Sequence, residues 1–456
     1  MGAHQEQSPA NVSELEEERR RLSREIGERK ARGEPTAGLV QRSRELSAAI
    51  KRLTPPRTVA APARQAAPVA AWTAEVLSSA AQVVGLRDEW CELLARATPR
   101  SPFLTWEWVA SWYETHEEAG DVRCLLVRDA AGHLVGLVPL FLSRRRDAKL
   151  GRRELGFAST YGHAWGSYLE PVYIPRAEHE VVQRLITYLH SVRDEWDCAK
   201  FLRMPAEAES AWPLVCAAGG HEWQVAVRPH PPLAVLALPA QTADVTDLLA
   251  SAKLRRNCRA ARRRLQRDYP QHRFRPWADL EELPGLLEAH VSLNIKGRTV
   301  RGLATNFGAL PYRECFRRAA QRLAAVGRLR VACLEIEGQV AGTLFCVPQR
   351  RTLYLWSLAW DWRWGDYEVA HLLFLEALRA GREEGATAAD FLMGEDRYKL
   401  RYTREARRVV DVVIWQKRLQ MARSIGGELS GHAVARARDA VARRGRASAG
   451  EARARQ

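Results

Sequence analysis

The expected fold is decided by WSLAWDWRWGDYEVAHLLFLEAL at Trp356–Leu378 and by DFLMGEDRYKLRYT at Asp390–Thr403. The apolar residues predict a strand over Thr352–Trp360 and, after a short loop, a helix over Tyr367–Glu384. A further strand is expected at Ala389–Met393, before a polar segment. Strand, loop, helix and strand in this order are typical of an α/β fold.

Similar units extend this pattern towards the N-terminus. The sequence predicts three helices and two strands upstream, at Lys253–Tyr269, Leu280–Val291, Tyr312–Ala325, Leu329–Ile336 and Val340–Val347. The hairpin EGQVAG at Glu337–Gly342 repeats AGHLVG at Ala131–Gly136, and an apolar strand follows each of them. Because supersecondary units that recur at long spacing indicate repeated domains, the sequence favours two similar domains.

The chain is expected to have five segments. Ser13 and Glu16 form a capping-box pattern near its start, and a run of Ala, Pro, Val and Arg from Pro55 to Ala71 cannot bury a core. The predicted segments are a helical hairpin at 1–54, an Ala/Pro linker at 55–71, a first domain at 72–240, a second domain with the working site at 241–418, and a basic helical or disordered tail at 419–456. The expected fold class is therefore α/β (mixed α+β), with an N-terminal helical hairpin.

Composition limits the classes of protein that the chain can belong to. With 456 residues, 46% apolar residues and 15 Trp, most of the chain should fold into packed cores. The eight cysteines include no CxxC pair, and HExxH, GxSxG, GxxxxGK[ST] and GxGxxG patterns are absent, so no disulfide framework and no metal are expected. Neither a signal-peptide pattern nor an apolar run of about 18 residues occurs, which predicts a cytoplasmic protein, free or peripheral to the inner face of the membrane.

Positive charge is concentrated in two places. The formal net charge is +16, and arginines gather at Arg255–Arg267 and from Arg436 to Arg455. Such a field attracts nucleic acid, anionic lipid headgroups or phosphate-bearing substrates. A solvated helical face is the competing interpretation of Arg255–Arg267, so the charge alone selects no partner.

Four further stretches, together with Trp356–Leu378 and Asp390–Thr403, carry a family resemblance. They are SPFLTWEWVASWYE at Ser101–Glu114, GLVPLFL at Gly136–Leu142, LRRNCRAARRRLQRDYP at Leu254–Pro270 and HVSLNIKGR at His290–Arg298. In this order they resemble FemAB-type and CelD-like acetyltransferases of the GNAT superfamily. The resemblance implies two fused GNAT-like domains over about Trp72–Trp415. It also implies that acyl-CoA, or aminoacyl-tRNA in FemAB enzymes, meets an amine or hydroxyl acceptor.

The N-terminal hairpin carries a second resemblance. The stretch RLSREIGERKARGEPTAGLVQRSRELSAAIKRL, residues 21–53, resembles the coiled-coil arm of seryl-tRNA synthetases. That resemblance implies a contact with tRNA, whereas short amphipathic hairpins more often mediate self-association. Both kinds of partner stay open at this point.

The loop after the strand at Thr352–Trp360 is the expected donor site. Free backbone amides at a helix N-terminus, beside a cation, suit the diphosphate of acetyl-CoA or another acyl-CoA. The candidate residues are Arg363, Trp364, Gly365, Asp366 and Tyr367. The segment lacks the glycine-rich spacing of simple GNAT enzymes, and the acids Asp366 and Glu368 oppose an anion. A purely structural turn is therefore the alternative.

The polar segment that follows the next strand is the expected acceptor site. Glu395 can accept a proton from the nucleophile, Tyr398 can donate to the leaving thiolate, and Lys399 can bind a phosphate or carboxylate. Further candidates are one base and two substrate-binding cations: His290, Arg298 and Arg397. Ordinary surface ion pairs, and a histidine that only caps a helix, are the competing interpretations.

Three functions fit these observations. The leading hypothesis is an acyl-CoA-dependent N- or O-acyltransferase for a cell-envelope or polysaccharide-related acceptor, a class that follows from the resemblance alone. The second is an aminoacyl-tRNA-dependent peptidyl transferase of the FemAB type, which the basic charge and the hairpin favour. The third is a nucleic-acid-binding or scaffold protein whose GNAT fold has lost catalysis.

Overall fold

The computed structural model describes residues 72–97, 101–144, 153–160, 166–221, 223–242, 244–393 and 398–416, with scattered positions between 17 and 46. The chain divides into two compact units, Met1–Val69 and Ala70–Gln456. In the first unit, described positions on either side of Pro35 and Thr36 are helical, and the hairpin as a whole stays a prediction. The predicted linker at 55–71 and tail at 419–456 lie outside the described residues.

Removal of Met1–Val69 is expected to leave the thermal unfolding of the remaining chain nearly unchanged, because the two units are compact separately. Differential scanning calorimetry of the full chain and of a chain that begins at Ala70 measures this. A clear fall in the midpoint of the shortened chain would instead mean that the N-terminal unit stabilises the larger one.

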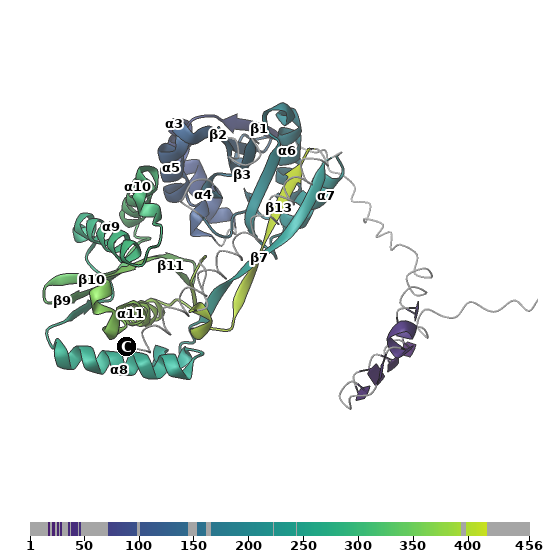
Figure 1. The fold of residues 1–456 in the computed structure, drawn as a ribbon. Coiled ribbons are helices and arrows are strands. Elements are labelled where there is room, and N and C mark those ends of the chain that lie inside the picture. Colours follow the sequence, from purple (N-terminus) through teal and green to yellow (C-terminus); the bar gives the residue numbers. More distant parts are fainter. Residues whose placement is uncertain are drawn as a thin grey trace, which may run out of the picture. The chain divides into compact units, whose positions relative to one another are not determined.

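The second unit is built on one long mixed sheet with helices against it (Figure 1). Twelve of its thirteen described strands follow one another in this order: β1 (Thr73–Leu77), β2 (Gly120–Arg128), β3 (Leu134–Ser143), β4 (Glu154–Phe157), β6 (Cys198–Pro205), β13 (Ala406–Trp415), β7 (Gln224–Ala237), β12 (Ala388–Asp390), β11 (Thr352–Trp360), β10 (Gln339–Gln349), β9 (Arg330–Ile336) and β8 (Arg273–Arg275). The other strand, β5 (Val172–Tyr173), pairs with β3. Neighbours are antiparallel except β4 with β6 and β11 with β12. The predicted α/β class is confirmed.

Two long strands join the two ends of this sheet. β13 is the last described strand in the chain, yet it lies between β6 and β7. β7 pairs with β13 as far as Ala234 and then with β12 through Val235–Ala237. It therefore connects the strands on the β13 side of the sheet with those on the β12 side (Figure 1). Strand pairing therefore crosses position 240, where the sequence predicts a domain boundary. The boundary itself stays a prediction.

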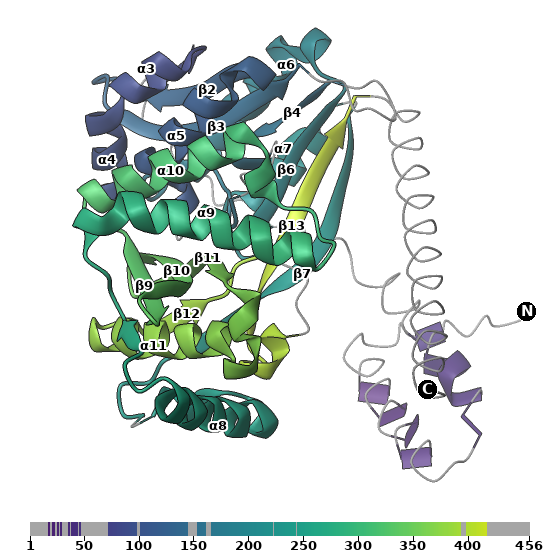
Figure 2. The ribbon, with the colours of Figure 1, turned by 60° about the vertical axis from the view of Figure 1, so that its left-hand side comes forward.

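Helices lie on both faces of strands β9–β12, as Figure 2 shows. The described helices of the second unit are α3 (Ala80–Gly85), α4 (Arg87–Arg96), α5 (Trp106–His116), α6 (Glu178–Ser191), α7 (Ala211–Gly219), α8 (Ala252–Asp268), α9 (Leu283–Val300), α10 (Leu310–Ala325) and α11 (Val369–Glu383). Side chains of β9 alternate between two cores, Val331 and Cys333 in one and Ala332 and Leu334 in the other. α9 contributes to the first core and α11 to the second. None of the described helices is long and apolar enough to cross a membrane.

Helix α9 is longer than the sequence predicts. The pattern predicts a helix that ends at Val291, but the helix continues to Val300, so Arg298 is helical as well as His290. The reason is a close approach to β11: a β-carbon at Gly297 would lie 3.3 Å from the carbonyl oxygen of Trp360. Glycine weakens the local helical signal, and tertiary packing overrides it here.

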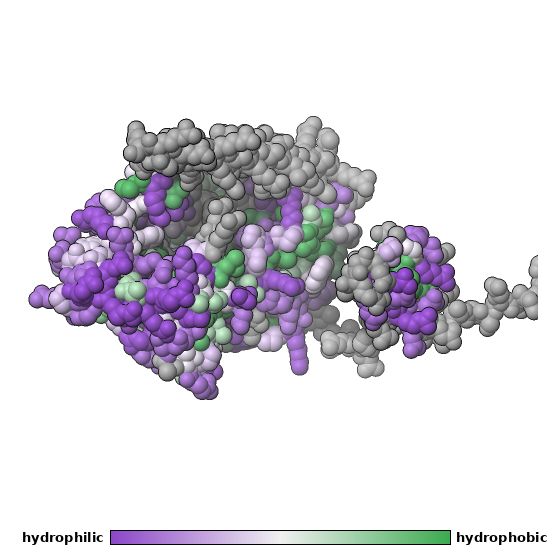
Figure 3. Space-filling model, turned by 60° about the horizontal axis from the view of Figure 1, so that its bottom comes forward, coloured by the Kyte–Doolittle hydropathy of each residue, from purple (hydrophilic) through white to green (hydrophobic). Residues whose placement is uncertain are grey.

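Helix α8 is basic and amphipathic. Its apolar side, which includes Leu254 and Leu265, is buried in the second core, and hydrophilic residues dominate the opposite face (Figure 3). Several of its cations pair with acids: Arg259 lies 2.6 Å from Asp247, and Arg262 lies 2.5 Å from a glutamate of α11. The charge of this face is thus partly neutralised within the protein.

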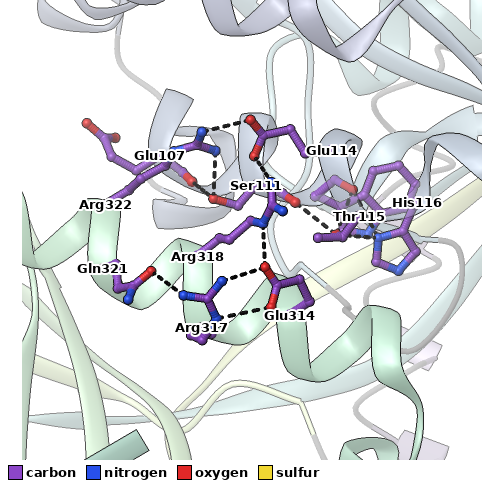
Figure 4. Close-up of polar contacts among 11 residues, drawn as sticks. Glu107, Ser111, Glu114, Thr115, His116, Glu314, Arg317, Arg318, Gln321 and Arg322 are labelled. Atoms are coloured by element: carbon purple, nitrogen blue, oxygen red, sulfur yellow. Dashed lines mark hydrogen bonds and ion pairs between the residues drawn. The ribbon is translucent and has the colours of Figure 1, made fainter. Parts of the chain in front are cut away.

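A charged cluster joins α5 to α10 (Figure 4). Glu114 of α5 accepts hydrogen bonds from Arg318 at 3.0 Å and Arg322 at 2.9 Å, and Arg322 also donates to the hydroxyl of Ser111 at 3.1 Å. Burial alone would raise the pKa of Glu114, but the two arginines lower it below its ordinary value. These contacts hold α10 against α5. Because α10 also packs on α9, they connect α9 with the N-terminal part of the second unit.

Candidate active site

The parallel strands β11 and β12 are neighbours over only three residue pairs, which end at Tyr354 and Asp390. β11 then continues along β10 to Trp360. The chain after β12 turns towards β7 instead, and the amide of Phe391 donates to the carbonyl of Ala234 at 3.0 Å. The two strands therefore part beyond Tyr354.

A cavity of about 700 Å³ lies where the strands part. It is lined by the second half of β11, the last turns of α9, the first turns of α11 and four residues after β12: Phe391, Met393, Tyr398 and Lys399. Small-molecule and cofactor sites usually measure about 300–1,000 Å³. The cavity is therefore large enough for a substrate or a cofactor.

β11 carries a β-bulge in the floor of this cavity. Ser357 lies opposite Phe345 of β10 and Leu355 lies opposite Cys346, so Trp356 has no partner in β10. The extra residue of a bulge is left out of the ladder of backbone hydrogen bonds. Because Trp356 and Ser357 both line the cavity, polar backbone groups released here can meet a ligand.

The N-terminus of α11 opens onto the same cavity. Val369 and Ala370, the first residues of this 15-residue helix, line it, and amides of a first turn have no acceptor inside their own helix. Three cations line the cavity as well: Arg298, Arg301 and Lys399. A helix N-terminus with cations nearby is suited to anions such as phosphate groups.

Glu368 places a carboxylate beside this helix end. The residue lines the cavity and has a φ of 51°, in the left-handed region that costs energy for residues other than glycine. Its Oε2 lies 3.6 Å from Nε2 of His371, and its Oε1 accepts from the Asn257 amide at 3.5 Å. His371 Nδ1 is hydrogen-bonded to the hydroxyl of Tyr402. We call Glu368, His371 and Tyr402 the polar relay.

The protonation of the polar relay follows from burial. Burial lowers the pKa of His371, although the charge of Glu368 opposes the shift. Burial also raises the pKa of Tyr402 well above its ordinary value. At neutral pH the phenol keeps its proton and the imidazole is uncharged. The phenol can thus donate to Nδ1, which leaves the imidazole hydrogen on the side of Glu368.

Most of the predicted donor residues do not line the cavity. Of Arg363–Tyr367, only Gly365 lines it. The guanidinium of Arg363 pairs with the carboxylate of Asp361, the nearest atoms 2.5 Å apart. The ion pair raises the pKa of Arg363 and lowers that of Asp361. The positive charge of Arg363, which the sequence predicts to face an anion, is therefore already balanced by Asp361.

The rest of this segment is attached to α8. Trp364 packs edge-on against Tyr269 with the ring centroids 4.9 Å apart, and the hydroxyl of Tyr367 donates to Asp268 at 3.1 Å. The carbonyl oxygen of Asp366 accepts from an arginine of the same helix. These contacts suit a structural turn, and the role of the segment in cofactor binding stays a prediction.

The predicted acceptor residues lie on the other side of the cavity. Lys399 and Tyr398 both line it. Lys399 is buried, and its Nζ donates to the carbonyl of Leu392 at 2.8 Å, so this lysine also holds the backbone of the segment. The ring of Tyr398 lies 6.5 Å from that of Phe374, centroid to centroid. Two predicted residues lie outside the described part of the chain: Glu395 and Arg397.

The remaining two candidates lie on α9. Arg298 lines the cavity, and its Nε donates to the carbonyl of Ala304. Next to it, the guanidinium of Arg301 stands 4.9 Å from the ring centre of Trp360. His290 is fully buried behind β11 and does not line the cavity. Its predicted role as a base is untested.

Sequence reasoning missed two residues of the polar relay and treated the third, Glu368, only as an acid that opposes an anion. His371 stands within an apolar helical stripe, where a single histidine is most simply interpreted as part of the core. Tyr402 is 31 residues further along the chain, so its contact with His371 has no local signal.

Residues 252–400 match the family model described as an acetyltransferase (GNAT) domain. This part of the chain is a GNAT domain. Most of the elements that line the cavity, namely α9, β11 and α11, lie inside the matched range. The resemblance to GNAT acetyltransferases is thereby confirmed for residues 252–400, and this domain supports the prediction of an acyltransferase.

Solved structures resemble this one at low sequence identity. A conserved protein of unknown function from Bacteroides thetaiotaomicron is 12% identical, with a TM-score of 0.48 over 73% of this chain and 97% of that chain. FemX is 12% identical, with a TM-score of 0.47 over 68% and 92%. A tandem GNAT protein from the clavulanic acid biosynthesis pathway is 11% identical, with a TM-score of 0.41 over 76% and 99%. No curated protein matches the chain.

The GNAT domain also bears on the cofactor. Such domains typically use acyl-CoA, and the cavity combines a helix N-terminus with cations, which fits a donor that carries phosphates. Among the described residues, no group of three or more His, Cys, Asp or Glu is placed to hold a metal ion.

Proposed function

We propose that the chain is an acyl-CoA-dependent N- or O-acyltransferase in which donor and acceptor meet in the cavity of the GNAT domain. The observation that carries this proposal is the parting of β11 and β12 beside the N-terminus of α11. It brings a bulged strand and an anion-binding helix end to one cavity, and acyl transfer from a phosphate-bearing thioester requires both kinds of group.

The residues of the cavity can be given roles in this reaction. The first turn of α11 and the nearby cations bind the diphosphate of the donor. Amides at the bulge, around Trp356 and Ser357, stabilise the negative charge that develops on the thioester oxygen. Glu368 accepts the proton of the attacking amine or hydroxyl, with His371 behind it. As the carbon–sulfur bond breaks, Tyr398 donates a proton to the leaving thiolate.

The acceptor is proposed to be a cell-envelope or polysaccharide-related molecule. This part rests on the family resemblance. Arg298 and Lys399 add chemical support, because cations on the cavity wall favour an acceptor or donor with phosphate or carboxylate groups. A place in the cytoplasm, at the inner face of the membrane, would suit such an acceptor.

An aminoacyl-tRNA donor is the second candidate, and the surface of α8 favours it. Arg256 and Arg263 are exposed on this helix, and no ion pair of theirs occurs among the described residues. Exposed arginines along one helix suit the phosphate backbone of RNA. A contact with RNA through the N-terminal hairpin would belong to the same proposal, and self-association through the hairpin is the alternative.

Calorimetric titration with acetyl-CoA and with aminoacyl-tRNA separates the candidates. For the leading proposal, acetyl-CoA binds, and its affinity changes little between about 50 and 200 mM salt. Binding of aminoacyl-tRNA that weakens steeply over this range would favour the second candidate, because it reports counterion release from a phosphate backbone. Binding of neither would leave a scaffold protein whose GNAT fold has lost catalysis.

Ala370→Glu is expected to weaken acetyl-CoA binding by about tenfold, which corresponds to about 1.4 kcal/mol. Ala370 is the second residue of α11 and lines the cavity, so a carboxylate there repels the diphosphate. Ala370→Gln is the matched control, since it adds nearly the same volume without the charge. An acid in a first turn stabilises a helix, so the thermal midpoint should not fall more for Glu than for Gln.

Equal affinities of the two Ala370 variants would contradict an anion site at α11. In that case volume alone would affect the ligand, and the diphosphate would have to bind elsewhere.

A further inference from the structure

Behind the floor of the cavity, His290 of α9 is enclosed by aromatic rings. Its imidazole stacks on Phe316 with the ring centroids 5.1 Å apart, and Phe345 stands edge-on at 4.8 Å. Both ring nitrogens have polar partners: Nδ1 lies 2.8 Å from the hydroxyl of Thr343, and Nε2 lies 2.8 Å from the hydroxyl of Ser357. A chain of three polar side chains thus leads from β10 through α9 to β11.

The imidazole in this chain is neutral. Burial lowers the pKa of His290 to about 3, so the ring carries one hydrogen at any physiological pH. A neutral ring donates through one nitrogen and accepts through the other. One of the two hydroxyls must therefore donate to the ring, and the other must accept from it.

The surroundings of Thr343 decide which hydroxyl donates. Thr343 is completely buried, and among the described residues its hydroxyl takes part in one hydrogen bond, that with His290. If it accepted from Nδ1, its own hydrogen would be buried without an acceptor, which is unfavourable. Thr343 therefore donates to Nδ1, and the hydrogen of the ring is on Nε2. Ser357 accepts that hydrogen.

This arrangement prepares Ser357 as a donor. Its oxygen is held by the ring, whereas its own hydrogen can turn into the cavity, which Ser357 lines at the bulge of β11. A nucleophilic serine would have to pass its proton to His290. The nitrogen that faces it already carries a hydrogen, and the surrounding apolar rings disfavour an imidazolium ion.

We propose that Ser357 donates a hydrogen bond from its hydroxyl to the carbonyl oxygen of the acyl donor, and that His290 and Thr343 are positioning residues that hold the hydroxyl in this orientation. The inference rests on the proposed function, since it concerns the same cavity. The bond strengthens as negative charge develops on the carbonyl oxygen, so it favours the transition state over the bound donor.

The hydrogen position can be measured in the free protein, without any substrate. In protein labelled with 15N-histidine, the imidazole shifts of His290 are identified by their loss in His290→Gln. The expected result is a hydrogen on Nε2, with no protonation between about pH 8 and pH 5. A hydrogen on Nδ1 would overturn the proposal, because Ser357 would then donate to the ring instead of the cavity.

Kinetics test the role of the hydroxyl. With hydroxylamine as a small acceptor and release of the CoA thiol from acetyl-CoA as the readout, Ser357→Ala should lower kcat by about a hundredfold, with little change in the Kd of acetyl-CoA. Ser357→Thr keeps the hydroxyl and suits a strand, so it should retain most of the rate. Thr343→Val removes the hydrogen bond to Nδ1 that helps to hold the ring, so it should lower kcat, although it changes nothing in the cavity itself.

The outcomes separate this proposal from the function on which it rests. A Ser357→Ala variant as active as the unmodified protein would overturn the role of Ser357 and leave the acyltransferase proposal intact. Equal losses in Ser357→Ala and Ser357→Thr would also overturn it, because they would indicate a packing role. An unmodified protein that neither binds acetyl-CoA nor releases CoA would overturn the proposed function, and with it the role of Ser357.

Discussion

Glu368→Gln is expected to lower the rate of acetyl transfer by about a hundredfold or more, since a positioned general base contributes about 10²–10⁴-fold. Glu368 lines the cavity, and its carboxylate stands 3.6 Å from Nε2 of His371. Glutamine keeps the size of the side chain and can keep the contact with Asn257, but it cannot take up the proton of the acceptor. Release of the CoA thiol with hydroxylamine as the acceptor measures the rate, and thermal melting checks the fold.

The same substitution also distinguishes two interpretations of this acid by the sign of its effect. If the carboxylate only opposes an anion at the N-terminus of α11, its removal should tighten acetyl-CoA binding and raise the rate at low donor concentration. That result would contradict a role as base. Tyr402→Phe is the control within the polar relay: it removes the hydroxyl behind His371 but keeps the ring against Phe391, and the rate should fall by only about tenfold.

The pH dependence of the rate follows from His371. Burial lowers the pKa of this imidazole below its ordinary 6.5, so more than half of the rings are neutral at pH 6.5 and nearly all are neutral at pH 8. Protonation would place a cation beside Glu368, and a carboxylate that is paired with this cation is less available to the proton of the acceptor. After correction for protonation of the acceptor, the rate should fall towards low pH with a midpoint below pH 6.5. A fall centred at or above pH 6.5 would contradict this account.

Much of the local structure of the GNAT domain could be predicted, because periodicity is a local property. The helix expected at Lys253–Tyr269 is α8, at Ala252–Asp268, and the three strands before α11 occur where the apolar runs place them. The place of β13 could not be predicted in this way. Its apolar run is evident in the sequence, but nothing in it indicates that its partners are β6 and β7, far upstream in the chain. Pairing between distant strands depends on the whole fold.

The location of the candidate site could be predicted from the sequence, but the contacts within the site could not. A strand, a loop and a helix pointed to the end of β11 and the start of α11, where the cavity lies. The bulge at Trp356 depends on the register between β10 and β11, which the sequence does not display. The contact between His371 and Tyr402 depends on how two residues that are 31 positions apart pack together. Both features arise from packing and not from any motif.

Asp390→Ala is expected to reduce the free energy of unfolding by about 3–5 kcal/mol, the usual effect of removing one partner from a buried ion pair. Asp390, at the end of β12, is completely buried. It accepts from the hydroxyl of Tyr168 at 2.6 Å and from the amide of Leu392 at 2.8 Å, and it lies 3.3 Å from the guanidinium of Arg407 in β13. These partners come from distant parts of the chain, so the loss should affect the whole second unit. Denaturant unfolding measures it.

Two further variants separate the charge of Asp390 from its hydrogen bonds. Burial raises the pKa of Asp390, so the charged form is itself disfavoured there, and Asp390→Asn keeps an acceptor for Tyr168 and Leu392. It should therefore cost clearly less than Asp390→Ala. Combining Asp390→Ala with Arg407→Leu should recover part of the loss, because the guanidinium is no longer left without its carboxylate. If Asp390→Ala alone cost no more than about 1 kcal/mol, as at an exposed ion pair, the cluster would not stabilise the second unit as a buried ion pair does.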